Sequence, residues 1–463
     1  MPVRQIHAWK PLAAFCTALL FPLVTASAAE GEATSFQPVA KDQSGLVFAP
    51  AGVEAEAVDK GRVRYRYKRR MHRRLHRHSI SHPHNRRVPV SRLEKALTQG
   101  TEVRVPRRRA RHGKLTVHTA PISKTACDWG AFGADAAPGS CWRPYSEQSP
   151  FNKSLPANVQ QVSNSAAIGN RTATFGSGAP MFKGGVADTT SDFGHSLYYS
   201  SPSDPVYTVD CVKSWGTCDV EGMQVRIPAK AKPTGGGDGH MGVIDQQNGV
   251  EYDFWQVLDK PAGGGTLKVS WGGKTAIGTP DATGLGSKAV AAGYGLAAGV
   301  IRPEELAAGE INHALFMTVK CTNGTSVYPA GKNTGRVCSE LGLSDADAPP
   351  MGAHFYLEMT QAQIDGLKAP AWQKAILRAM VTHGMFVGDT GASANGWTLK
   401  VQSGTSYTSL GFADPWVELG KENGLPTVTG SDGSADYLFD LRKTLDWKSK
   451  LRVAQPCVAQ GSC

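Results

Sequence analysis

One stretch of the sequence gathers residue types that act on carbohydrates. Residues 240–257 read HMGVIDQQNGVEYDFWQV, and Asn248-Gly249 predicts a β-hairpin turn. Strand side chains alternate between faces, so a two-residue and a four-residue turn give the same two faces. One face gathers an imidazole, two carboxylates and an indole, around Gly242: His240, Glu251, Asp253 and Trp255. The other face is apolar and is expected to face the core: Met241, Val243, Tyr252 and Phe254.

The polar face suits a sugar ring. An indole stacks on the C–H faces of a sugar, while carboxylates and imidazoles bind its hydroxyls. Two carboxylates can also serve as acid and base, or as acid and nucleophile, on a glycosidic bond. Glu251 and Asp253 stand two residues apart, with Cα atoms about 6.5–7 Å apart on one strand, which leaves retaining and inverting chemistry both open. An ordinary half-solvated hairpin is the competing interpretation. A metal site is disfavoured because Asp245 falls on the face opposite His240, and no metal or cofactor is expected.

Other candidate site residues lie further along the chain. The segment 310–317 reads as a strand that starts at Glu310, and His313 shares its apolar face, as a core histidine would. His354 shares a strand face with Tyr356 and Glu358. We count Glu310 and Asp389 as candidate catalytic residues, together with His240, Glu251 and Asp253. The candidate substrate-binding residues are Trp255, His313, His354 and Trp397.

Asp389 belongs to an Asp-Thr-Gly triplet, which is typical of aspartic proteases. Those enzymes need two aspartates that share a proton, and this sequence has no second such triplet in an apolar strand. The triplet therefore does not indicate a protease. Asp389 stays a candidate cleft residue because it lies at a strand-to-turn junction with Trp397 shortly after it.

The mature region is predicted to be mainly β. Turn signals separate short alternating runs over residues 119–463, which favours a sandwich or jelly-roll-like domain. One short helical pair interrupts this pattern. Thr360 with Gln363 forms a capping-box pattern, and Pro370 opens a second helix that ends at Gly384.

The first 29 residues have the pattern of a secretory signal peptide: a positive start, an apolar run and Ala26-Ser27-Ala28 before the cut. Cleavage would remove Cys16 and leave eight cysteines, an even number that indicates disulfides in an exported protein. Spacing suggests four local bridges: Cys127–Cys141, Cys211–Cys218, Cys321–Cys338 and Cys457–Cys463. No transmembrane segment follows, so we expect a secreted, extracellular protein.

Charge is concentrated in one segment. Residues 60–118 hold 20 Lys and Arg against Glu94 and Glu102, a balance of +18, whereas the rest of the chain carries −7. We expect residues 30–118 to form a basic, low-complexity, disordered linker or propeptide. The basic part either binds anionic polymers of the envelope or matrix or serves only as a spacer.

Five stretches resemble a broad group of secreted bacterial proteins that is defined by segment order and not by an assigned activity. They are CWRPYSEQSPFNKSLP, DGHMGVID…EYDFWQ, GEINHALFMTV, PPMGAHFYL and AILRAMVTHGMFVGDTG. The likeness covers residues 127–436 and implies secretion and one domain, but no chemistry. Polar positions of the pattern are His240, Asp245, Asp253, Glu310, His313 and Asp389. Gly388-Asp389-Thr390-Gly391 stands where similar proteins read Ala-Asp-Asn-Gly.

Together these features lead us to expect a protein that acts on extracellular polysaccharide by cleaving a glycosidic bond. Glycoside hydrolysis is favoured over a lyase, because a polyuronate lyase needs cations to neutralise its substrate and the chain outside residues 60–118 carries a balance of −7. A non-catalytic carbohydrate-binding or wall-associated module is the main alternative, and an adhesive coat protein is a third.

Overall fold

The computed structural model describes only part of the first 137 residues: 36–42, 45–50, 53–58, 62–67, 88–89, 103–105, 115–117, 129 and 132. Beyond them it describes 138–175, 181–391, 397–430, 433 and 435–463. The predicted signal peptide and most of the predicted linker lie outside the described residues.

Short strands are what the structure describes within residues 30–118. They pair locally, β1 with β2, β4 with β3 and β5, and β6 with β7. Their bounds are β1 Phe36–Asp42, β2 Gly45–Pro50, β3 Val53–Val58, β4 Arg62–Tyr67, β5 Val88–Pro89, β6 Val103–Val105 and β7 Leu115–Val117.

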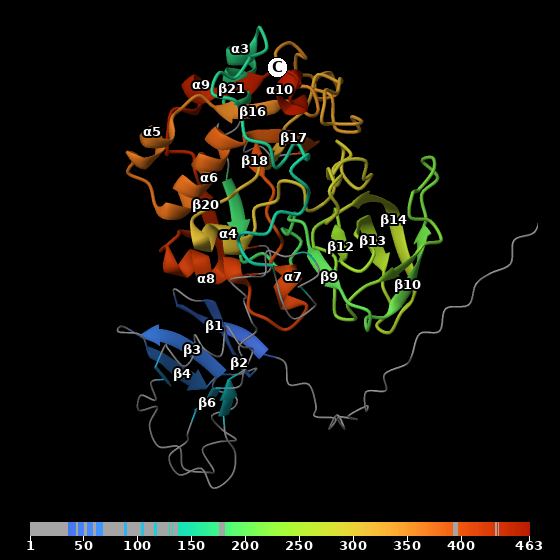
Figure 1. Cartoon of the computed structure of the whole chain (residues 1–463), viewed down its shortest axis with the longest axis vertical. Coiled ribbons are helices and arrows are strands. Elements are labelled where there is room, and N and C mark those ends of the chain that lie inside the picture. Colours follow the sequence, from blue (N-terminus) through green and yellow to red (C-terminus); the bar gives the residue numbers. More distant parts are fainter. Residues whose placement is uncertain are drawn as a thin grey trace, which may run out of the picture. The chain divides into compact units, whose positions relative to one another are not determined.

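The predicted hairpin lies inside a mixed six-stranded sheet with the order β11-β10-β14-β13-β12-β9, drawn in green to yellow in Figure 1. Val243 pairs with Tyr252, so the four-residue turn 246–249 is the register that forms. The apolar face predicted for the hairpin packs into a core of its own. The strands are β9 Leu197–Ser200, β10 Val206–Cys211, β11 Gln224–Arg226, β12 Met241–Asp245, β13 Val250–Asp259 and β14 Gly265–Ala276.

Two further sheets complete the described architecture and confirm that the domain is mainly β. The five-stranded sheet has the order β18-β15-β17-β16-β21, and the three-stranded sheet the order β19-β20-β8. Their strands are β15 Leu315–Val319, β16 His354–Leu357, β17 Met385–Thr390, β18 Thr398–Leu399, β21 Leu451–Ala454, β8 Met181–Gly184, β19 Thr427–Thr429 and β20 Ala435–Asp440. The strand expected from Glu310 begins only at Leu315.

The predicted helical pair forms as α5 (Gln361–Asp365) and α6 (Ala371–Thr382), and Thr360 caps α5 through the N–H of Gln363. Short helices that the sequence did not predict accompany it: α3 Ser165–Thr172, α4 Pro303–Ala308, α7 Thr405–Thr408, α8 Pro415–Glu422, α9 Trp447–Lys450, α10 Pro456–Gln460 and the 3-10 turn η2 Ser339–Leu341. No helix among the described residues is long and apolar enough to cross a membrane.

A fully buried segment without regular secondary structure joins the six-stranded sheet to α4 and β15. This segment, residues 289–300, is here called the buried connector, and it reads AVAAGYGLAAGV. Its small side chains let neighbouring strands approach closely; a Cβ on Gly295, for example, would lie 2.7 Å from Glu251 Oε2. The main core contains connector residues together with side chains from both large sheets, so the connector lies at the centre of the domain.

Three of the four predicted disulfides are present: Cys211–Cys218, Cys321–Cys338 and Cys457–Cys463. Cys141 is also disulfide-bonded, while its predicted partner Cys127 lies outside the described residues. These local bridges are compatible with an exported protein.

Phe254→Ala is expected to destabilise the domain by about 3–5 kcal/mol, because this fully buried ring belongs to the core beneath the hairpin. Leu258→Ala on the same strand is the control, since Leu258 is 54% exposed. Denaturant unfolding of both variants measures the difference. Equal losses would show that the assigned inner face of β13 is not the core face.

Candidate functional site

A large cleft with a cavity volume of about 1200 Å³ lies between the six-stranded sheet and segments at the ends of strands of the five-stranded and three-stranded sheets. Strands β13 and β14 contribute tryptophans to it, and β17 contributes Asp389 at its C-terminal end. Segments 397–404 and 331–336 line it as well, together with β8 and the start of α8. A cleft of this size has room for several sugar rings.

Three tryptophans form an aromatic platform on one side of the cleft. Trp255 and Trp271 are paired across β13 and β14. The Trp215 ring lies 5.5 Å from that of Trp255 and 5.8 Å from that of Trp271, with tilts of 38° and 42°. Trp215 is 62% exposed, which is unusual for so large an apolar side chain. Trp255 is half-buried and Trp271 is only 8% exposed, so Trp215 is the ring of this platform that is free for a sugar to stack on.

Basic side chains line the cleft too. Lys288 donates to Asp219 at 2.6 Å, and Lys332 Nζ donates to the carbonyl of Lys288 at 3.1 Å. Lys400 Nζ donates to the carbonyl of Phe193 at 2.9 Å. Arg336 is exposed in the same lining. The cleft therefore carries more local positive charge than the net charge of −7 outside residues 60–118 suggested.

Asp389 is the predicted catalytic residue that the structure does place in the cleft. Its Oδ1 accepts the N–H of Thr390 at 2.7 Å. Burial raises the pKa of Asp389 to about 6, against opposing effects of Lys400 and Lys332. A second carboxylate of the lining, Asp238, is close enough to raise that pKa further. Asp389 can thus exchange protons near neutral pH, as general acid–base chemistry requires.

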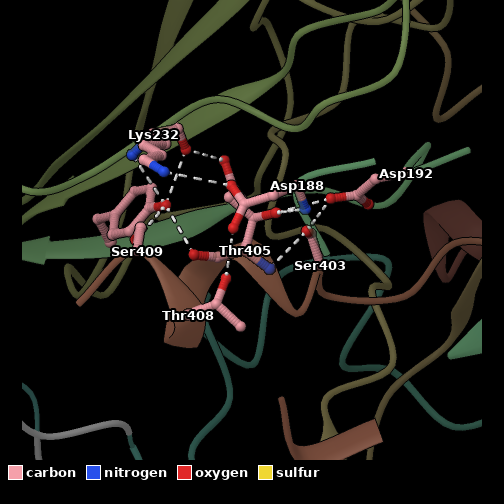
Figure 2. A network of polar contacts seen from close by, with 9 residues as sticks. Asp188, Asp192, Lys232, Ser403, Thr405, Thr408 and Ser409 are labelled. Atoms are coloured by element: carbon pink, nitrogen blue, oxygen red, sulfur yellow. Dashed lines mark hydrogen bonds and ion pairs between the residues drawn. The ribbon is translucent and has the colours of Figure 1, made fainter. Parts of the chain in front are cut away.

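A polar network fixes another part of the cleft lining, as Figure 2 shows. Asp192 is buried and accepts hydrogen bonds from Ser403 Oγ at 2.5 Å and Thr405 Oγ1 at 2.8 Å. Asp188 accepts from Thr408 at 3.0 Å and lies 3.6 Å from Lys232 Nζ. These bonds hold α7 and the segment before it against the loop that follows β8. The carboxylate of Asp192 is therefore occupied by protein hydroxyl groups and not free for a ligand.

Two buried polar groups in the cleft lining have no hydrogen-bond partner among the described residues. They are Thr318 Oγ1 and Trp397 Nε1, on side chains that are 5% and 2% exposed. Buried polar groups are normally satisfied, so each needs a water molecule or a ligand group. Trp397 also packs edge-on against Trp447, with ring centroids 5.3 Å apart.

Glu251 and Asp253 are not in the cleft, so the prediction that they face outward was wrong. Both are fully buried on the face of β13 that meets the connector. Glu251 accepts the Tyr145 hydroxyl at 2.5 Å and the Ala297 N–H at 2.7 Å, and Asp253 accepts the Leu296 N–H at 3.2 Å. Their carboxylates satisfy backbone groups that the connector has no strand or helix to pair. Trp255, the half-buried member of the predicted face, does reach the cleft.

His240 has a similar role beneath the cleft. It is 1% exposed, and its Nε2 contacts the Ala289 carbonyl at 3.4 Å. His195, which the sequence analysis did not consider, contacts the Leu296 carbonyl at 2.7 Å and lies edge-on to His240 with centroids 4.9 Å apart. Burial lowers the pKa of both imidazoles, that of His240 to about 4. Both rings are therefore neutral at pH 7.

The other predicted site residues lie away from the cleft. His313 is buried against Glu305 at 3.1 Å, and Glu305 also holds Arg302 at 3.0 Å, which makes His313 part of a core ion cluster. Glu310 is exposed outside the cleft. His354 is buried, stacks on Phe386 at 4.0 Å and contacts the His383 carbonyl at 2.8 Å. None of these three contributes to the cleft lining.

Sequence reasoning missed Trp215 and Trp271 and the cleft cations. Trp271 had a detectable signal, because it follows the hairpin in the next antiparallel strand and pairs with Trp255. Trp215 lies in the short loop closed by the Cys211–Cys218 disulfide, whose cysteines are separated by 7 positions, and an apolar residue there has no core to enter. The lysines carry no local pattern, since tertiary packing brings them together.

No protein-family model matches this sequence, and no curated protein or solved structure matches it either.

Asp253→Asn is expected to be tolerated, and to make stability less dependent on pH. Burial and the charge of Glu251 raise the pKa of Asp253 well above its ordinary value, so its proton is retained in the folded state. A carboxyl group whose pKa is raised by folding stabilises the fold fully at pH values below its pKa in the unfolded chain, which is about 3.9 for Asp. That contribution is lost as the pH rises through its pKa in the folded state. Asparagine removes this loss because it is neutral at every pH.

Denaturant unfolding of Asp253→Asn and of the unsubstituted protein between pH 4 and 8 measures the effect. The variant should gain relative stability toward pH 8. Glu251→Gln is the contrast, with an expected loss of about 1–3 kcal/mol because it weakens the acceptor of Tyr145 and Ala297. If the stability difference between Asp253→Asn and the unsubstituted protein does not vary with pH, Asp253 does not keep its proton in the folded state.

Proposed function

We propose that this protein is exported and acts on an extracellular polysaccharide, which it binds in the cleft and cleaves at a glycosidic bond beside Asp389. The observation that carries this proposal is the platform of Trp215, Trp255 and Trp271, with its exposed Trp215 ring, which lines the same cleft as a carboxyl group with a pKa of about 6. Stacking on the platform orients the sugar chain, and the hydrogen bonds of Asp192 to Ser403 and Thr405 hold another part of the cleft lining in place. The local disulfides support export.

Hydrolysis in this cleft needs two groups. One protonates the glycosidic oxygen as the C–O bond breaks, and the other removes a proton from the water that attacks the sugar carbon. Asp389 suits the acid, because burial keeps part of it protonated near neutral pH. Asp238 is the other lining carboxylate that influences Asp389 electrostatically, and it suits the base. This pair replaces Glu251 and Asp253 as our catalytic hypothesis.

The basic segment 60–118 adds a second proposed contact, with anionic polymers of the envelope or matrix, through its balance of +18. Such a contact would concentrate the protein near its polysaccharide without contributing to catalysis.

Trp215→Ala is expected to weaken polysaccharide binding about fivefold, since loss of one stacking contact costs roughly 1 kcal/mol. The fold should be unaffected because the side chain is mostly exposed. Isothermal titration against a panel of plant and microbial polysaccharides measures the change. Leu258→Ala, an exposed apolar residue outside the cleft lining, is the control and should bind normally. If Trp215→Ala binds polysaccharide as tightly as the unsubstituted protein, the tryptophan platform is not part of the binding site.

Asp389→Asn is expected to lower kcat by a factor of at least about 100 and to leave KM within a fewfold range, because it removes a proton donor and keeps the shape. Turnover of the unsubstituted protein should fall as pH rises through about 6, where Asp389 loses its proton. Asp281→Asn, an exposed carboxylate outside the lining, is the control. Reducing-end release measures turnover. Binding without turnover in the unsubstituted protein would leave a carbohydrate-binding module as the function.

A further inference from the structure

We infer that the cleft selects an acidic polysaccharide, in which an anionic group on the sugar ring binds between Lys332 and Arg336 while a neighbouring ring stacks on the tryptophan platform. This inference rests on the proposed function and specifies its substrate class. The shared chemistry is a negative charge on the sugar, carried either by a uronate carboxylate or by a sulfate ester.

The two basic residues are cations that are not tied up in ion pairs. Among the described residues, neither Lys332 nor Arg336 forms an ion pair with a carboxylate, whereas Lys183 and Lys288 of the same lining pair with Asp436 and Asp219. Lys332 is held in place by the Lys288 carbonyl at 3.1 Å. Burial and the charge of Lys288 lower the pKa of Lys332, and the nearby carboxylates of Asp389 and Asp219 only partly offset this.

Their position places them beside the proposed cleavage point. The backbone N–H of Arg336 donates to Thr390 Oγ1 at 2.8 Å, and Thr390 follows Asp389 directly, while the exposed Arg336 side chain belongs to the cleft lining. Lys332 is close enough to Asp389 for each to shift the pKa of the other. Guanidinium and ammonium groups at this point would neutralise a carboxylate or sulfate on the ring nearest the scissile bond. A neutral sugar would leave both cations without a partner.

The carboxylates of the cleft do not cancel this selectivity. Asp192 is committed to Ser403 and Thr405. Burial raises the pKa of Asp414 to about 7, so Asp414 is partly neutral at pH 7, and that of Asp389 to about 6, which leaves Asp389 mainly ionised. Lys332, Arg336 and Lys400 form no ion pair among the described residues, and these three cations outnumber Asp389 and Asp238, the two lining carboxylates other than Asp192 and Asp414.

The test compares polymers of one backbone with and without charge, using the full chain. Polygalacturonate with its methyl ester tests the carboxylate, and dextran sulfate with dextran tests the sulfate. Binding of short oligosaccharides is followed by quenching of tryptophan fluorescence and compared with that of Trp215→Ala, so that the signal reports the cleft and not the basic segment. We expect at least one anionic ligand to bind about tenfold more tightly than its neutral counterpart.

The double variant Lys332→Met/Arg336→Met should lose this preference, and Lys332→Arg, which keeps the charge, should retain it. The double variant Lys268→Met/Lys274→Met is the matched control, because both lysines are exposed on β14 outside the cleft lining. Melting temperatures check that each variant is folded. Equal binding of neutral and anionic ligands, or a preference that survives Lys332→Met/Arg336→Met, would overturn the inference. Failure of Trp215→Ala to affect any ligand would instead overturn the proposed function.

Discussion

The buried connector imposes the constraint on which the rest of the domain depends. A buried segment with no regular secondary structure leaves backbone N–H and C=O groups without partners, and each unsatisfied group costs about 1–3 kcal/mol. Glu251 and Asp253 supply acceptors to the N–H groups of Ala297 and Leu296, while His195 contacts the Leu296 carbonyl. With these contacts in place, the connector can join the two large sheets and carry its small residues through the main core.

This constraint also explains how the cleft is built. Tight packing of the connector against β13 and the end of β17 fixes Trp255 and Asp389 relative to one another; the Ala292 N–H, for example, donates to the Gly388 carbonyl at 3.0 Å. The loop that carries Lys332 is held by the same segment, because the Gly331 N–H donates to the Ala292 carbonyl at 3.1 Å. Catalytic and binding groups in the proposed site thus stand on one rigid support, as preorganised chemistry requires.

Buried carboxylates and histidines in this protein show how structural and catalytic roles use the same residue types. Glu251, Asp253, His240 and His313 are all buried, and their partners are backbone groups, the Tyr145 hydroxyl or a charged core side chain. Asp389 differs because it borders a cavity large enough for a ligand. The distinction lies in what each group faces, and burial alone does not reveal it.

The sequence by itself determined the local features. Alternation and the Asn-Gly turn gave the two faces of the hairpin, the capping box gave α5, and close cysteine spacing gave three disulfides. Each of these depends on residues near one another in the chain. The tertiary structure decided that the polar face of β13 is buried as well, because residues 289–300 cover Glu251 and Asp253 and leave Trp255 at the cleft. It also assembled Trp215, Lys332 and Asp389 from distant segments, a grouping that no local pattern encodes.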